Sequence, residues 1–465
     1  MLLNIATAQE GSVIRLNATI QRYSVTQPWE KTEPSNKYGL ATFIEGGYIV
    51  TTAETVRDAV YLEFETIDRS LRIPAKVKVI DYSANLALIE AVQGEDKKKL
   101  ESLLKPVGVN QLGTIGEQAE VLQVQITGKF IKNKCRIQEA EVYSNLRLNL
   151  KGSLQSSSNS RSLPVFSGGD LLGLVSTYDG DDQIISIIAP EVISSFLEDA
   201  KDDDYSGFPS LGVNYVNTRD KNFRDWLKLD DSREGIYVTG IRKGSPAETA
   251  GIKEGDVILA LGDFNIDNQG YVETEAYGKL HYNYAVKLKH KMGEKVEATL
   301  LRDGEEKKLE VKFQHLAERV IPRYTYDTAP NFLIKGGIVF QELTSDYIMA
   351  YGKDWATRAP IELLDVYYHP HEYEEGRNRV VFISGVVRTP ATLGYENVHH
   401  IIVDKVNGQV IADMKSLGEA FKNPKDGIHT IEVSGEPGKI YLSEDLSSEV
   451  DATLKQRGVP SLSRY

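Results

Sequence analysis

The residues able to perform nucleophilic or acid–base chemistry are unevenly spread along this chain of 465 residues. All eight histidines lie at or after His281, and the sole cysteine is Cys135. Hydroxyl groups gather in a serine-rich stretch from Ser153 to Ser162. A serine hydroxyl is a weak nucleophile until a base takes its proton, and that base is normally an oriented histidine. The first 280 residues therefore hold hydroxyl groups but no imidazole that could activate them.

Metal, disulfide and thiol chemistry are not predicted. One cysteine cannot form a disulfide within one chain, and the alternating pattern around Cys135 is typical of a strand. His399 and His400 are adjacent, so on a strand they point to opposite faces. His369 and His371 lie in a polar stretch without a third ligand at a fixed spacing. We expect no metal site and no cofactor.

The composition is that of an ordinary globular protein, with 41% hydrophobic and 26% charged residues. The length suggests roughly two to four domains. No run approaches the ~20 apolar residues of a spanning helix, so we expect no integral membrane protein. The net charge of -13, with both signs interspersed, argues against nucleic acid as a partner. Near the N-terminus, Ala6-Thr7-Ala8 has the small-x-small form of a signal-peptidase site but lacks a basic region before it. It predicts a truncated export signal and an extracytoplasmic (periplasmic or secreted) location, with a chance match as the alternative.

Residues 10–200 are predicted to form β structure, with a helix over 190–200 at the end of this segment. The predicted strands are separated by turn residues and cover 13–20, 40–51, 73–80, 119–126 and 171–177. The acidic run from Asp202 to Asp204 then marks a linker. This pattern predicts a barrel or sandwich.

Two related modules follow. In the first, Ser245 and Pro246 begin a short helix and Gly251 ends it, a longer helix is expected over 284–291, and Asp303-Gly304 predicts a hairpin. In the second, Asn407-Gly408 predicts a hairpin. A helix follows Asp413, and an insertion covers about 345–378.

Three blocks of the first segment resemble the protease domain of the Deg/HtrA serine proteases. The run from Phe43 to Ala53 resembles the strand before that family's catalytic histidine, and Glu54 follows it. The run from Val79 to Ile89 resembles the block that holds the catalytic aspartate, with Asn85 at that position. The stretch over 159–175 resembles the G-N-S-G-G-P block, with Arg161 at the nucleophile position.

The resemblance implies a mainly β chain, a trypsin-like double β-barrel over 10–200 followed by two PDZ-like α+β domains over 208–318 and 330–465. It also implies that no catalytic triad remains, since the three positions hold Glu54, Asn85 and Arg161. The glycines that shape the oxyanion hole are replaced as well, by Asn159, Ser162 and Leu163. Whether Glu54 and Arg161 form an ion pair or are two drifted surface residues stays open.

The start of the first module resembles the PDZ loop that captures a peptide's terminal carboxylate. The family pattern is x-Leu-Gly-hydrophobic, so Leu211, Gly212 and Val213 are the implied carboxylate residues. The pocket for the last apolar side chain would draw on Ile252, Val286 and Leu288. Recognition of this kind is β-augmentation, in which the peptide adds a strand to a sheet edge. The alternative is that Leu211 and Val213 are only core residues of a strand.

Together these features predict a non-catalytic scaffold or chaperone-like factor that binds peptide segments or protein C-termini. The resemblance implies a homo-oligomer, with a trimer as the family's form. Two alternatives stay open: an active serine endopeptidase with a displaced catalytic set, and a regulatory subunit of an active homologue.

Overall fold

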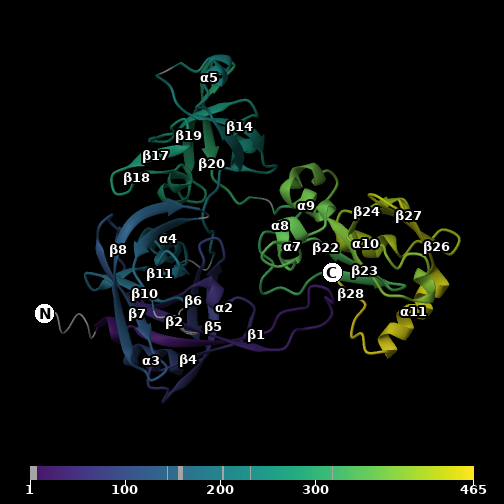
Figure 1. Ribbon diagram of the computed structural model, residues 1–465, viewed down its shortest axis with the longest axis horizontal. Coiled ribbons are helices and arrows are strands. Elements are labelled where there is room, and N and C mark those ends of the chain that lie inside the picture. The colour runs from purple at the N-terminus through teal and green to yellow at the C-terminus, as the bar shows by residue number, and fades with distance from the viewer. Residues whose placement is uncertain (1–7, 144, 155–160, 202–203, 231, 317) are drawn as a thin grey trace. The chain divides into compact units, whose positions relative to one another are not determined.

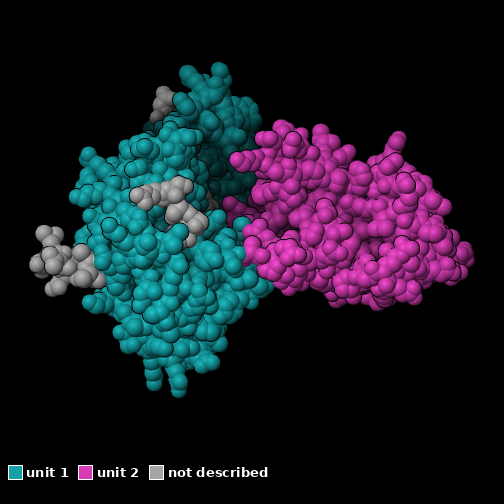
Figure 2. All heavy atoms as spheres, turned by 60° about the horizontal axis from the view of Figure 1, so that its bottom comes forward, with its two compact units in different colours: residues 1–20, 36–317 teal, residues 21–35, 318–465 magenta. Residues whose placement is uncertain are grey.

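The computed structural model describes residues 8–143, 145–154, 161–201, 204–230, 232–316 and 318–465. Its chain forms two compact units, one of residues 1–20 with 36–317 and one of residues 21–35 with 318–465 (Figure 2). Ala6 and Thr7 of the signal-like motif lie outside the described residues, as do Asn159 and Ser160. In the part of the chain that is described, no helix is long and apolar enough to cross a membrane.

Two closed six-stranded barrels begin the first unit (Figure 1). The first has the order β1-β2-β3-β6-β5-β4, and the second has the order β10-β11-β12-β9-β8-β7. Alternating residues such as Leu16 and Phe64 fill the interiors. The first barrel's elements are β1 (Val13–Ile20), β2 (Ser35–Ile44), β3 (Tyr48–Thr51), α2 (Ala53–Val56), β4 (Ala59–Glu65), β5 (Arg72–Asp81), β6 (Leu86–Ala91) and α3 (Gly94–Leu103). The second barrel's are β7 (Gln118–Val124), β8 (Phe130–Val142), β9 (Leu146–Lys151), β10 (Pro164–Ser167), β11 (Asp170–Asp179), β12 (Ile184–Ile188) and α4 (Pro190–Asp199).

The predicted strand over 40–51 is wrong as one element, because it is two strands, β2 and β3, joined by a turn. Gly46 and Gly47 adopt φ of 86° and 79°, a conformation that favours glycine, so the chain reverses there. The hairpin places Thr51 at the end of β3, immediately before α2.

The remainder of the first unit is built on a sheet with the order β13-β14-β15-β19-β20. The Ser245 hydroxyl caps α6 and Gly251 ends it in the left-handed conformation, as predicted. The helix predicted over 284–291 is present, but it is π-helical over η1 and ends before His290, which turns extended and stacks on Phe313 at 5.6 Å. The elements are β13 (Val213–Asn217), α5 (Lys221–Leu227), β14 (Ile236–Ile241), α6 (Pro246–Ala250), β15 (Val257–Leu261), β16 (Phe264–Asn265), β17 (Tyr271–Thr274), β18 (Gly278–His281), η1 (Ala285–Lys289), β19 (Lys295–Arg302) and β20 (Glu305–Lys312).

The second unit holds a longer sheet with the order β27-β26-β24-β23-β22-β21-β28. The predicted insertion is largely helical, and the Asp413 side chain caps the helix expected after it. The elements are β21 (Phe332–Lys335), β22 (Ile338–Glu342), α7 (Ser345–Met349), α8 (Trp355–Arg358), α9 (Ile361–Tyr368), η2 (Pro370–Tyr373), β23 (Val381–Val386), η3 (Pro390–Thr392), β24 (Ile401–Val406), β25 (Gln409–Val410), α10 (Met414–Ala420), β26 (Ile428–Val433), β27 (Lys439–Ser443), α11 (Glu444–Gln456) and β28 (Ser463–Arg464).

Residues 21–35, which connect β1 to β2, belong to this second unit rather than to the barrel. The Trp29 ring lies 6.0 Å from the Phe332 ring, and Arg464 Nη1 donates to the Pro28 carbonyl at 3.3 Å. The Arg464 guanidinium also lies 4.5 Å from the centre of the Tyr23 ring. The second unit is therefore assembled from two separate stretches of the chain.

Candidate functional site

Glu54, Asn85 and Arg161, which are far apart in the sequence, meet in the first unit. Glu54 lies in α2, directly after β3, and Asn85 lies in the turn before β6 with φ of 56°. The Glu54 backbone N–H donates to Asn85 Oδ1 at 2.9 Å, and Arg161 Nη1 lies 3.0 Å from Glu54 Oε1. The ion pair that the sequence left open is thus present, and a carboxylate, an amide and a guanidinium occupy this position.

Ser162 is a buried structural residue in this arrangement. Its Oγ accepts a hydrogen bond from the Thr52 N–H at 3.0 Å and lies 3.0 Å from Thr51 Oγ1. Among the described residues its hydrogen-bond partners are these two threonines, and neither is a base. Leu163 is fully buried immediately before β10. The hydroxyl of Ser162 therefore joins the turn to β3 instead of facing a proton acceptor.

The exposed ion pair is expected to contribute little to stability. Both Glu54 and Arg161 side chains are 47% exposed, and pairs of this kind contribute on the order of 0–1 kcal/mol. Arg161→Ala is expected to lower the free energy of unfolding by less than about 1 kcal/mol in denaturant titration. The matched variant Glu54→Ala should behave alike, whereas a loss well above that range would show that the pair anchors the two barrels.

Leu211 and Gly212 directly precede β13, and Val213 begins this strand, which is the end strand of its sheet. Leu211, Ile252 and Val286 belong to one buried cluster, against which Val213 and Leu288 pack. Gly212 has φ of 82°, and its carbonyl accepts from the Arg242 N–H at 2.9 Å. The β13 edge opposite β14 is unpaired among the described strands, so it offers backbone groups to an added strand.

A tyrosine of the same edge strand pairs with a histidine of β18, a contact that was not predicted from the sequence. Tyr215 of β13 lies with its hydroxyl 2.8 Å from His281 Nε2, and the Asn283 N–H donates to His281 Nδ1 at 3.1 Å. Because Nδ1 accepts, the neutral imidazole carries its proton on Nε2 and donates it to Tyr215. The two partners are 66 positions apart, so no local pattern signals the contact.

Acid is expected to destabilise this part of the first unit. Burial lowers the pKa of His281 because the charged imidazolium is poorly solvated there. The unfolded chain therefore binds the proton more readily, and stability falls as the pH drops below about 6.5. The slope is at most about 1.4 kcal/mol per pH unit.

The measurement is the free energy of unfolding at pH values from 7.5 to about 5, for the wild type and for His281→Gln. Burial also lowers the pKa of His400 in the second unit, so only the difference between the two profiles reports on His281. Parallel profiles would contradict the prediction.

The corresponding edge in the second unit is covered by the chain itself. The order β27-β26-β24-β23-β22 parallels β20-β19-β15-β14-β13, so β22 corresponds to β13. Here β21 pairs antiparallel with β22, and β28 pairs with β21 in turn. Leu333 of β21 and Leu417 of α10 belong to one buried cluster. Strand β21 therefore lies next to α10 as well as next to β22. This edge already carries an added strand.

Comparison with known proteins agrees with this architecture. Models of the PDZ domain match residues 209–313 and residues 321–462. Protease Do-like 4, mitochondrial, of Arabidopsis thaliana is 23% identical over 98% of this chain and 85% of its own length. Protease Do-like 2, chloroplastic, of the same plant is 24% identical over 97% of this chain and 74% of its own length. The chain is a homologue of the Deg/HtrA proteases.

The solved structure of the HtrA-type protease AlgW with a decapeptide shares the fold of this Deg/HtrA homologue. Its TM-score is 0.51 at 14% identity, covering 68% of this chain and 98% of that one. The expected fold is thereby confirmed, a mainly β chain with a trypsin-like double barrel followed by PDZ domains. The named relatives are proteases, and their names place them in mitochondria and chloroplasts.

Proposed function

We propose that this Deg/HtrA homologue is a protease-like protein without a catalytic triad, which binds peptides through its first PDZ domain as a scaffold or chaperone-like factor. The observation that carries the proposal is the pairing of Glu54 with Arg161 at 3.0 Å beside Asn85. By the resemblance, Glu54 occupies the position of the catalytic histidine, Arg161 that of the serine and Asn85 that of the aspartate.

The chemistry of the paired residues supports loss of proteolysis. A guanidinium stays protonated and is no nucleophile, and the carboxylate of Glu54 is paired with it. Residues 1–280 hold no histidine, so the barrels cannot supply the usual base from their own sequence. Ser162 is engaged by Thr51 and Thr52. An active endopeptidase would need a different catalytic set.

The open edge of β13 supports peptide binding. Leu211, Gly212 and Val213 precede or begin that edge, and Ile252 and Val286 lie in the adjoining apolar cluster. The AlgW structure, which shares this fold, contains a decapeptide. The second PDZ domain has its edge covered by β21, so we assign peptide capture to the first domain only.

The cellular setting in this proposal is extracytoplasmic, with the chain in a homo-oligomer such as a trimer. In a variant of the proposal, the chain assembles with an active homologue as its regulatory subunit. Co-purification from the native host tests this variant. Recovery of homo-oligomers only would count against that variant.

The test combines a turnover assay with a binding assay on the full chain. We expect no casein cleavage and no labelling by a fluorophosphonate serine probe. Cleavage and labelling that both disappear in Ser160→Ala with Ser162→Ala would overturn the proposal. In the binding arm, a decapeptide with a free apolar C-terminus should bind at least about tenfold more tightly than its C-terminal amide. Equal binding of acid and amide would overturn the assignment of a carboxylate-capturing loop.

A further inference from the structure

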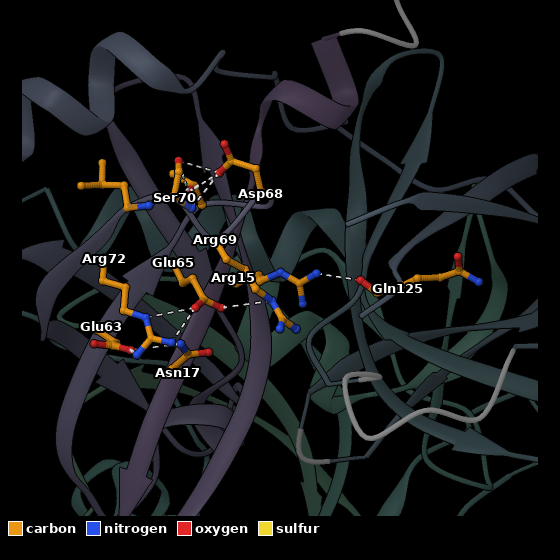
Figure 3. A network of polar contacts seen from close by, with 11 residues as sticks. Arg15, Asn17, Glu63, Glu65, Asp68, Arg69, Ser70, Arg72 and Gln125 are labelled. Carbon is orange, nitrogen blue, oxygen red and sulfur yellow. Dashed lines mark hydrogen bonds and ion pairs between the residues drawn. The ribbon is translucent and has the colours of Figure 1, made fainter. Parts of the chain in front are cut away.

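A cavity of about 260 Å³ opens beside the first barrel and is lined by three arginines. Figure 3 shows Arg15 of β1, Arg69 of the β4–β5 turn and Arg72 of β5 around the carboxylate of Glu65. The remaining lining residues are Asn17, Tyr38, Gly39, Leu40 and Ile126. The cavity is thus cationic on one side and largely apolar on the other.

Arg15 is the unusual member, because its side chain is almost entirely enclosed. The residue is 5% exposed, and its Nη2 donates to the Gln125 carbonyl at 2.7 Å. Among the described residues, no acceptor lies within hydrogen-bonding distance of its buried Nε. A buried donor without a partner is unfavourable, and a charged one more so. The Nε itself is enclosed, so an anion in the cavity would meet the other guanidinium N–H groups of Arg15, which lines the cavity.

The acidic neighbours do not use up the positive charge. Arg72 holds Glu65 Oε1 at 2.9 Å and Glu63 Oε1 at 3.2 Å, and Arg69 Nε lies 4.0 Å from Glu65 Oε2. Of the residues that line the cavity, three are arginines and one, Glu65, is acidic, so the lining carries a net positive charge. Burial and then the nearby Arg69 lower the pKa of Arg15, while Glu65 acts in the opposite direction. An added anion would stabilise the charged form of Arg15 further.

The apolar side of the cavity restricts the kind of anion. Leu40 is buried, while Tyr38 and Ile126 are exposed hydrophobic residues at the rim, Ile126 with 69% of its surface accessible. The Leu40 N–H donates to the Arg161 carbonyl at 3.3 Å, so the cavity adjoins the Glu54–Arg161 position. A ligand that fills both sides needs a compact anionic head and an apolar body.

We propose that this cavity binds the carboxylate of a ligand with an apolar body, with Arg15 and Arg69 as its cationic contacts. The ligand is a free carboxylic acid or a glutamate side chain within an apolar peptide segment. A planar carboxylate matches the fork of a guanidinium, and the hydrophobic rim excludes strongly hydrated anions. The site is separate from the edge of β13 and does not depend on peptide capture there.

Isothermal titration of the full chain tests the proposal with four probes. These are phenylacetate, acetyl-Leu-Glu-Leu-amide, its glutamine counterpart, and inorganic phosphate. We expect one site per chain for phenylacetate or the glutamate peptide, and no binding of the glutamine peptide. Binding of phenylacetate alone identifies a free acid as the ligand, and binding of the peptide alone identifies a side chain.

Variants tie the binding to the cavity. Arg15→Met is expected to weaken carboxylate binding at least about tenfold, and Ile126→Asp should do likewise by repulsion from an exposed position. Arg219→Met, an exposed arginine of the first PDZ domain, is the matched control and should bind as the wild type does. If Arg15→Met fails to fold, Arg69→Gln and Ile126→Asp decide the result. No carboxylate binding at millimolar concentration, unchanged binding in these variants, or a preference for phosphate would overturn the proposal.

Discussion

Replacing Arg302 with methionine is expected to lower the free energy of unfolding of the first PDZ domain by about 3–5 kcal/mol. Arg302 of β19 holds both carboxylate oxygens of Asp256, with Nε to Oδ1 at 2.6 Å and Nη2 to Oδ2 at 2.7 Å. It also donates to the Gly251 carbonyl at 2.8 Å. Asp256 is 1% exposed, so the substitution leaves a buried negative charge without its countercharge.

The measurement is denaturant unfolding followed by the fluorescence of Trp226, which lies on α5 of the same domain. Lys295→Met is the matched control, because it breaks a pair with Glu310 in which both side chains are mostly exposed. Its effect should stay below about 1 kcal/mol. A loss in Arg302→Met no greater than in the control would contradict the prediction.

Gly212→Ala is expected to disable the carboxylate-binding loop and to lower stability by about 2–4 kcal/mol. A Cβ at Gly212 would lie 2.3 Å from Ser245 Cβ, which cannot be accommodated without movement of the α6 cap. The φ of 82° adds the strain of a left-handed alanine, roughly 1–2 kcal/mol. Displacing this loop should abolish binding of the free-carboxylate decapeptide.

Gly251→Ala separates the two contributions. Gly251 has the same φ of 82°, and a Cβ there would meet nothing within 4 Å. In this variant the free energy of unfolding should fall only by the cost of the backbone strain, about 1–2 kcal/mol, and the affinity for the decapeptide should be unchanged. Peptide titration and denaturant unfolding of both variants give the comparison. Equal losses of affinity in the two variants would refute the assigned role of the loop.

Much of the local structure could be predicted from the sequence because it depends on near neighbours. Ser245 caps its helix and Gly251 ends it through contacts a few residues away. The turns at Asp303-Gly304 and Asn407-Gly408 join paired strands for the same reason. The helix expected over 284–291 forms but ends at Lys289, because His290 is extended and stacks on Phe313, a contact outside the helix.

The residues of the candidate site were likewise predictable only where a local sequence motif identifies them. The resemblance was sufficient to select Glu54, Asn85 and Arg161, which the structure brings together. It did not reveal that Tyr215 contacts His281, or that Arg15 lies beside Arg69, since these pairs form only when distant strands meet. The covering of β22 by β21 was also missed, because a strand's hydrophobic pattern does not identify its partner.

The membership of residues 21–35 in the second unit has a consequence for how the chain is made. Arg464 and Pro28 are hydrogen-bonded across 436 positions, and Gln341 reaches the Val25 carbonyl across 316. During synthesis from the N-terminus, this segment emerges well before its partners in residues 318–465. The second unit therefore completes only after Arg464 has emerged, and contacts of such separation close slowly. Cutting the chain between residues 317 and 318 would leave the first unit whole but the second incomplete, since residues 21–35 would stay on the other fragment.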